Sequence, residues 1–174
     1  MPRKFLSVFL FMAVCALPAA AADTALEVPL PNPLQSAKAG QWVQYRITTL
    51  FGSAEQKQTI LSIDGDENDD ERVLTIKSEM IIDGEVVDER TDAITYKQAL
   101  QEQANALEES QDVKTRLATV DFNGQKLEAV EVDFVQQGKH CLLYLSEKVP
   151  VVGMISMTVD NEDGPAMQLI DYGD

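Results

Sequence analysis

The chain has a single histidine, and a cysteine follows it directly. An imidazole base beside a thiol is the arrangement that activates a cysteine nucleophile. His140 and Cys141, however, lie in a segment with strand character, and adjacent strand residues point to opposite faces of a sheet. We therefore expect His140 to be a surface residue at a strand end and Cys141, next to leucines, to be a small buried apolar residue.

Residues 64–71 form the sharpest charge run, with the alternate spacing of a calcium-binding loop at Asp64, Asp66 and Asn68. The rest of that pattern fails. Asp69 stands where the bend needs glycine, and Thr75 stands where a bidentate glutamate belongs. We interpret the run as a solvated connection between two strands and predict no metal site.

Paired carboxylates are the remaining source of chemistry. Glu131 and Asp133 share one face of a predicted strand, and we interpret them as the solvated half of an alternating pattern. The sequence has no Gly-x-Ser-x-Gly motif, glycine-rich phosphate loop, Cys-x-x-Cys or histidine-rich spacing. We predict no catalytic, cofactor-binding or metal-binding residue and expect a protein that is not an enzyme. A carboxylate enzyme stays open as an alternative, because 29 acidic residues allow many pairs.

The N-terminus has the pattern of a secretory signal peptide. Arg3 and Lys4 precede an apolar run at 5–17, and small residues end at Ala22. The run is shorter than the roughly 20 residues that span a bilayer. We expect cleavage after Ala22 and a periplasmic or secreted protein. A membrane anchor and a lipoprotein attached at Cys15 are the alternatives.

We divide the chain into a signal peptide at 1–22, an extended proline-rich lead-in at 23–40, and a single β-rich domain at 41–174. Removing 22 of 174 residues leaves 152, which suits one domain. The loss of Arg3 and Lys4 changes the net charge from −15 to −17. Such a charge repels nucleic acid and anionic lipid surfaces. One cysteine is left, so no internal disulfide can form.

Alternation of apolar and polar residues predicts nine antiparallel strands. Three of the expected turns contain glycine, at Asp83-Gly84, Asn123-Gly124 and Gln137-Gly138. The predicted strands are 42–49, 57–64, 72–82, 85–95, 117–122, 130–134, 139–146, 154–159 and 167–172. Residues 51–54 and 108–116 are expected to be loops. The outer half of the ribbon formed by 72–82 and 85–95, with Glu85, Asp88, Glu89 and Arg90, is expected to be solvated.

A helical period interrupts the strands at 97–109. Leu100, Ala104 and Leu107 form an apolar stripe, and we expect Thr95 to cap the helix start on its own. The predicted fold is mainly β (α+β). It is a single curved antiparallel sheet or half-barrel of about nine strands, with one amphipathic helix against a sheet face.

Four segments resemble a group of exported, mostly uncharacterised bacterial proteins that are similar to the outer-membrane lipoprotein carriers. They are 32–45 (NPLQSAKAGQWVQY), 120–127 (VDFNGQKL), 143–157 (LYLSEKVPVVGMISM) and 167–173 (MQLIDYG). The resemblance implies a curved sheet that wraps a helix and an exported protein, and it implies no reaction. The group's commoner form has tryptophan in place of Tyr144 and a basic residue in place of Ser156, which weakens any inherited ligand site.

The functional expectation is a non-enzymatic protein that binds an apolar or lipid-like ligand, or a partner segment, in the half-barrel. Ordinary core filling is the alternative interpretation of its apolar residues. A structural or interaction protein of the cell envelope without a small ligand is the alternative function. The expected partners are lipid or an envelope protein, without cofactor or nucleic acid. The predicted apolar lining is Leu100, Leu107, Leu143, Leu145, Met154 and Met157.

Overall fold

The computed structural model describes residues 28–49, 52–66, 69–108, 110–160 and 164–174, without the side chains of 102–104 and 106–108. Three expectations fall outside these residues. They are the signal peptide at 1–22 with its alternative at Cys15, the first part of the lead-in at 23–27, and the side chain of Leu107.

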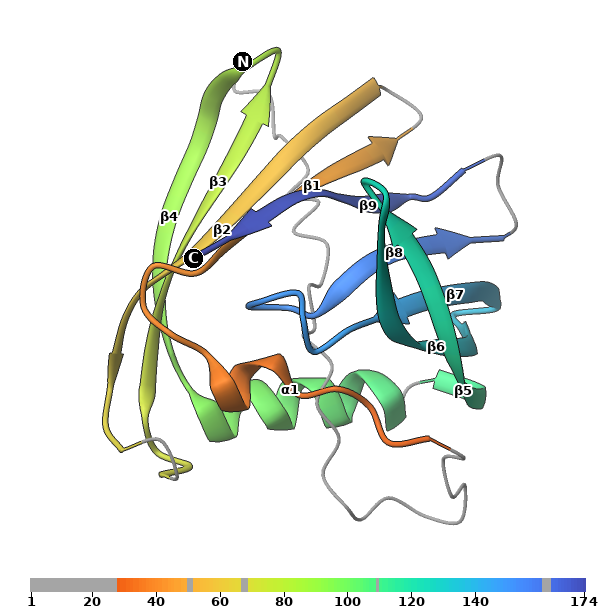
Figure 1. The fold of residues 1–174 in the computed structure, drawn as a ribbon, viewed down its shortest axis with the longest axis horizontal. Helices are drawn as coiled ribbons and strands as arrows, with labels where there is room; N and C mark the ends of the chain where they lie inside the picture. Colours follow the sequence, from red (N-terminus) through yellow and green to blue (C-terminus); the bar gives the residue numbers. More distant parts are fainter. Residues whose placement is uncertain (1–27, 50–51, 67–68, 109, 161–163) are drawn as a thin grey trace, which may run out of the picture.

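The described residues fold into one antiparallel sheet of nine strands and one α-helix. The strands are β1 (Trp42–Thr49), β2 (Gly52–Asp64), β3 (Val73–Ile82), β4 (Glu85–Thr95), β5 (Ser110–Phe122), β6 (Gln125–Gln136), β7 (Lys139–Leu145), β8 (Met154–Val159) and β9 (Met167–Gly173). They are ordered β4-β3-β2-β1-β9-β8-β7-β6-β5, so β4 and β5 are the end strands of an unclosed sheet. Figure 1 shows that the sheet is strongly curved. The predicted mainly β fold and its nine strands are confirmed.

The predicted glycine turns set the register of the hairpins. Asp83 and Gly84 have φ of 53° and 81°, and Asn123 and Gly124 have φ of 52° and 80°. Positive φ at both central residues is the signature of a type I′ turn, which matches the twist of the flanking strands. Ile82 therefore pairs with Glu85, and Phe122 pairs with Gln125.

Helix α1 (Tyr96–Glu108) connects the two end strands and runs across the open side of the curved sheet (Figure 1). The Thr95 hydroxyl accepts from the Gln98 amide at 3.1 Å, and the Gln98 side chain accepts from the Thr95 amide at 3.0 Å. This is a complete capping box, so the expectation that Thr95 caps alone is wrong. Tyr96 and Ala99 are buried, which fixes the first turn. The amphipathic stripe beyond it stays a prediction.

Two predicted loops are strands instead. β2 begins at Gly52, whose carbonyl accepts from the Thr49 hydroxyl at 2.9 Å, so most of the expected loop at 51–54 belongs to the β1–β2 hairpin. β5 begins at Ser110, within the expected loop at 108–116. This segment lacks alternation because it lies at a sheet edge and contains a bulge between Gln111 and Lys114.

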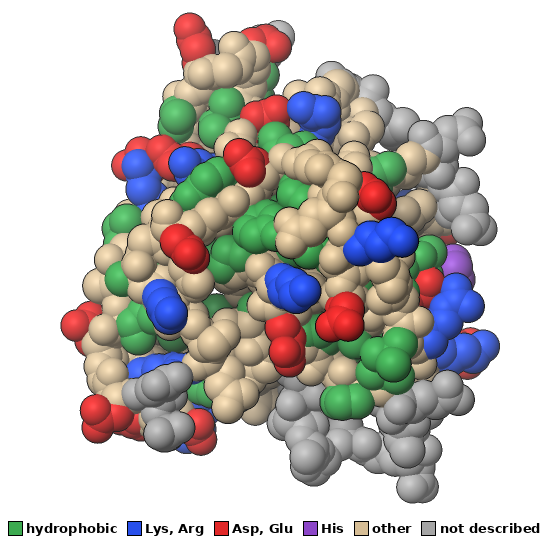
Figure 2. Space-filling view, viewed as in Figure 1, with side chains coloured by type: hydrophobic (Ala, Val, Ile, Leu, Met, Phe, Trp, Pro, Cys, Tyr) green, Lys and Arg blue, Asp and Glu red, His purple; other side chains and the backbone are tan. Residues whose placement is uncertain are grey.

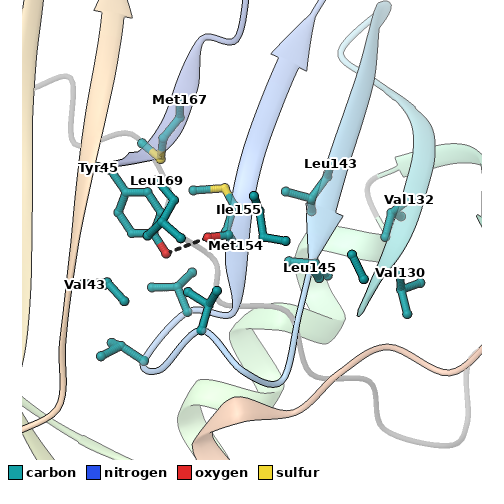
Figure 3. Close-up of a cluster of buried hydrophobic side chains, with 14 of the residues drawn as sticks. Val43, Tyr45, Val130, Val132, Leu143, Leu145, Met154, Ile155, Met167 and Leu169 are labelled. Carbon is teal, nitrogen blue, oxygen red and sulfur yellow. Dashed lines mark hydrogen bonds between the residues drawn. The ribbon is translucent and has the colours of Figure 1, made fainter. Parts of the chain in front are cut away.

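The main apolar cluster lies on the sheet face that carries Val43, Tyr45, Leu169, Leu143 and Val132, which we call the inner face (Figure 3). Pairing across the strands places these side chains on one side of the sheet. The buried Tyr45 hydroxyl donates to the Met154 carbonyl at 3.1 Å, and burial raises the pKa of this phenol.

Candidate functional site

The structure brings together four of the six predicted lining residues. Leu143, Leu145 and Met154 are buried in the main cluster, and Met157 packs against it half-buried. Leu100 packs instead against a second cluster. That cluster consists of Leu34, Leu74, Tyr96 and Ala99. Leu100 therefore belongs to a different cluster from the other four, and Leu143, Leu145 and Met154 are already covered.

The loop between β7 and β8 provides this cover. Residues 146–153, which we call the valine loop, lie inside the curve of the sheet between β7 and β8 (Figure 1). Val149, Val151 and Val152 are buried in the main cluster. The Ser146 amide donates to the Gly153 carbonyl at 2.7 Å and closes the loop at its base. Its signal in the sequence is an apolar composition, which is unusual for a surface connection.

The valine loop contains a strained turn. Val151 has φ of 63°, and the Val152 amide donates to the Pro150 carbonyl at 2.8 Å. A hydrogen bond from the amide of residue i+2 to the carbonyl of residue i, with positive φ at the residue between them, defines the rare and strained form of the γ-turn. Such a conformation in a β-branched residue costs about 1–3 kcal/mol and persists only where its surroundings hold it.

The opposite end of the sheet is open. The first nine residues of β4, Glu85–Ala93, are all exposed, which confirms the predicted solvation of Glu85, Asp88, Glu89 and Arg90. On the β3 side of the same ribbon, only Ile82 is exposed. Val86 and Val87 are 53% and 56% exposed, and Ile82 across the turn is also exposed. Figure 2 shows hydrophobic and acidic side chains together on the projecting end of this hairpin. An end strand with both faces exposed is a template for another strand.

Backbone alternation identifies the groups at this open edge. The Tyr96 amide donates to the Arg72 carbonyl at 2.9 Å, so the neighbouring Thr95 amide faces away from β3, and it bonds to Gln98. From Thr95 back to Asp88, the β3–β4 ladder has no register shift. Hydrogen-bonding direction alternates along an antiparallel ladder. The amides and carbonyls of Glu89, Thr91 and Ala93 therefore point to the open edge.

The charged side chains along β4 are mainly acidic. Asp88, Arg90 and Asp92 pair with inner-face residues of β3 and so lie on the inner face, whereas Glu89 lies on the other. Arg90 Nε contacts Asp92 Oδ2 at 3.2 Å. On the outer face, Lys77 of β3 contacts Glu89 at 2.9 Å. The hydrogen bonds that Lys77 donates to Glu79 and then to Glu89 raise the pKa of Lys77.

The interpretation of Glu131 as a solvated residue is wrong. Its side chain is only 7% exposed and lies between Arg116 of β5 and Tyr144 of β7. Arg116 Nε and Nη2 donate to the two carboxylate oxygens at 2.5 and 2.9 Å, and the Tyr144 hydroxyl donates at 2.8 Å. The Arg116 hydrogen bond is the main reason that the pKa of Glu131 is lowered. Burial and the Glu131 carboxylate raise the pKa of Tyr144.

His140 and Cys141 lie as predicted, on opposite faces of β7. The His140 side chain is 42% exposed, and its Nε2 is 2.7 Å from Asp133 Oδ1, a contact that the sequence analysis missed. Cys141 is buried, which raises the pKa of its thiol. The two side chains therefore form no nucleophile–base pair.

The acidic run joins β2 to β3 and is exposed at each of its described positions, as predicted. In the part of the chain with described side chains, no three His, Cys, Asp or Glu residues form a group that could hold a metal ion. None of the helices within the described ranges has the length and apolar run needed to cross a membrane.

Comparisons with known proteins add no name to this geometry. No protein-family profile matches the chain, and neither a curated protein sequence nor a solved structure matches it significantly.

Proposed function

We propose that this protein is an exported, non-enzymatic interaction protein that binds a segment of another protein at the β4 edge of its half-barrel. The observation that carries the proposal is the exposure of Glu85–Ala93 on both faces of an end strand. An exposed edge of this length presents a row of backbone donors and acceptors to a partner chain.

The contrast with the other end of the sheet supports the proposal. At β5, the Thr115 hydroxyl is within 2.9 Å of the Val28 amide and 3.0 Å of the Val28 carbonyl, and Thr115 is buried. A segment of the chain itself thus packs against the inner face of β5, and β5 has no exposed run longer than two residues. No comparable contact covers β4 among the described residues, because its exposed run ends only at Ala93.

Photocrosslinking in the producing cells tests this function. A photoreactive residue in place of Thr91 is expected to yield a discrete protein adduct after irradiation. The matched control is the same residue in place of Thr119, which is exposed on the β5 edge and points its amide outward by the same hairpin alternation. No adduct at Thr91, or the same adducts at both positions, would contradict the proposal.

A second candidate function is binding of an apolar ligand beneath the valine loop. The strain at Val151 favours it, because strained turns are common in segments that move on ligand binding. An acyl chain would contact Leu145 and Met154 only after this loop moved away.

Matched variants separate this second candidate from simple destabilisation. Val149→Ala weakens the loop, and Val132→Ala removes the same atoms from an equally buried position on β6. If the loop must move, only Val149→Ala raises the affinity for a fatty acid, because opening then costs less. Native mass spectrometry and a fluorescent fatty acid measure this. Equal affinity in both variants, or no binding in any form, would exclude the ligand.

A further inference from the structure

The charges on β4 specify the kind of segment that fits its edge. We infer that the edge receives an extended segment by strand addition, with basic residues on either side of an acidic one and β-branched residues between them. This inference rests on the proposed function and identifies the chemistry of the partner.

The backbone supplies the affinity and fixes the register. Glu89, Thr91 and Ala93 direct their amides and carbonyls outward at alternate positions, which is the spacing that an incoming strand requires. A segment paired with these residues forms hydrogen bonds without disturbing the β3–β4 ladder. The type of partner is therefore an extended chain and not a helix.

The side chains supply the specificity. Residues directly opposite on neighbouring strands have Cβ atoms about 4.5–5.5 Å apart, so charges there interact strongly. A residue opposite Asp88 or Asp92 is favoured when it is basic, and one opposite Arg90 is favoured when it is acidic. On the other face, Thr91 is small and the Glu89 carboxylate is already within 2.9 Å of the Lys77 ammonium group, so an uncharged valine or isoleucine suits the position opposite each of them.

A second copy of this chain fits the edge less well. Antiparallel pairing of β4 with itself centred on Glu89 places two glutamates opposite each other, and centring it on Arg90 pairs Asp88 with Asp92. Like charges directly opposite are destabilising. Centring the pairing on Thr91 places Arg90 opposite Asp92, but residues 85–93 carry four carboxylates against one arginine, so two copies of this edge repel each other overall. The acidic edge thus disfavours self-association, while it accepts a partner of complementary charge.

Two capped peptides test the inference on the full mature protein. One carries Lys-Val-Glu-Val-Lys, which matches Asp92–Asp88 in antiparallel order, and the other carries the inverted pattern Glu-Val-Lys-Val-Glu. We expect the first to bind at least about tenfold more tightly, with the preference reduced by salt. We also expect it to slow amide exchange at Glu89, Thr91 and Ala93.

Two proline variants make the test specific to the edge. Thr91→Pro removes an outward amide without removing a ladder bond, which an edge strand tolerates. Thr119→Pro does the same on β5. We expect Thr91→Pro to weaken binding of the first peptide about tenfold or more and Thr119→Pro to leave it within about twofold.

Equal binding of the two peptides, equal loss in the two variants, or no binding of the first peptide would overturn the inference. A crosslinked partner at Thr91 together with any of these results would reject strand addition and leave the proposed function standing. Absence of that partner would reject both.

Discussion

The two ends of the sheet differ in how much of their surface the rest of the chain covers. At the β6–β9 end, the inner face is covered by the valine loop, and Leu145 is 1% exposed. At the β3–β4 end, the strands extend beyond the core, and nine consecutive residues of β4 are exposed. One end therefore provides the stability of the fold, while the other presents a strand with little of its surface buried.

The difference shows that strand length alone does not decide which part of a sheet is core. β4 has 11 residues and β8 has six, yet β8 begins with two buried residues and β4 with nine exposed ones. What separates them is the connection that follows or precedes the strand. The apolar loop before β8 folds back over the sheet, whereas α1 leaves β4 uncovered.

The largest effect is expected at the covered end. Leu145→Ala should lower the free energy of unfolding by about 3 kcal/mol, because it opens a cavity in a close-packed cluster. Leu117→Ala is the matched control, since Leu117 is 76% exposed, and should change stability by less than about 0.5 kcal/mol. Urea unfolding of both variants measures the difference. Similar losses would mean that the two leucines do not differ in burial.

An intermediate effect is expected from the buried carboxylate. Glu131→Gln should lower the free energy of unfolding by about 1–2 kcal/mol at pH 7, because the amide has no negative charge and only one oxygen that can accept from Arg116 and Tyr144. The exposure of Arg116 limits the loss through solvent screening.

The pH dependence of this loss follows from the pKa of Glu131. The folded-state pKa lies below the unfolded value of about 4.5, so the carboxylate stabilises the fold at pH values above 4.5. The stabilisation disappears as the pH falls through the folded-state pKa. The difference in the free energy of unfolding between wild type and Glu131→Gln should therefore shrink as the pH falls below 4.5, and it should vanish once the pH is below the folded-state pKa. If the difference in the free energy of unfolding between wild type and Glu131→Gln stayed constant from pH 7 to pH 3, this would contradict a charged Glu131.

The smallest effect is expected at the open end. Val87→Thr should change the free energy of unfolding by less than about 0.5 kcal/mol, because Val87 lies at the exposed bulge of β4. Thermal unfolding provides the comparison with wild type. A loss above about 1 kcal/mol would show that this hairpin is packed against another surface and that the edge is not open.

Local patterns were sufficient to predict most of this fold. The Asp83-Gly84 and Asn123-Gly124 turns and the alternation of Val130, Val132 and Phe134 depend only on neighbouring residues. The start of β5 at Ser110 depends on pairing with β6, which no local pattern reveals. Gln98, three residues after Thr95, completes the capping box and was the signal overlooked there.

The sites described above were harder to predict from the sequence, because they depend on contacts between distant segments. Glu131 alternates with apolar residues exactly as a solvated residue would, and only Arg116 and Tyr144 on neighbouring strands explain its burial. The position of the valine loop over the inner face likewise could not be predicted, because it depends on the curvature of the sheet. The exposure of β4 was predicted from its charges, but its outward-facing amides followed only from the bond between Tyr96 and Arg72.

Residue-resolved amide exchange of the protein tests the central claim most directly. The open-edge account predicts that Thr91 and Ala93 exchange at close to intrinsic rates, while Arg90 and Asp92 are protected by β3 and Val132 is protected most strongly. Protection of Thr91 and Ala93 equal to that of Arg90 and Asp92 would mean that the β4 edge is already covered, and it would contradict the proposed binding site.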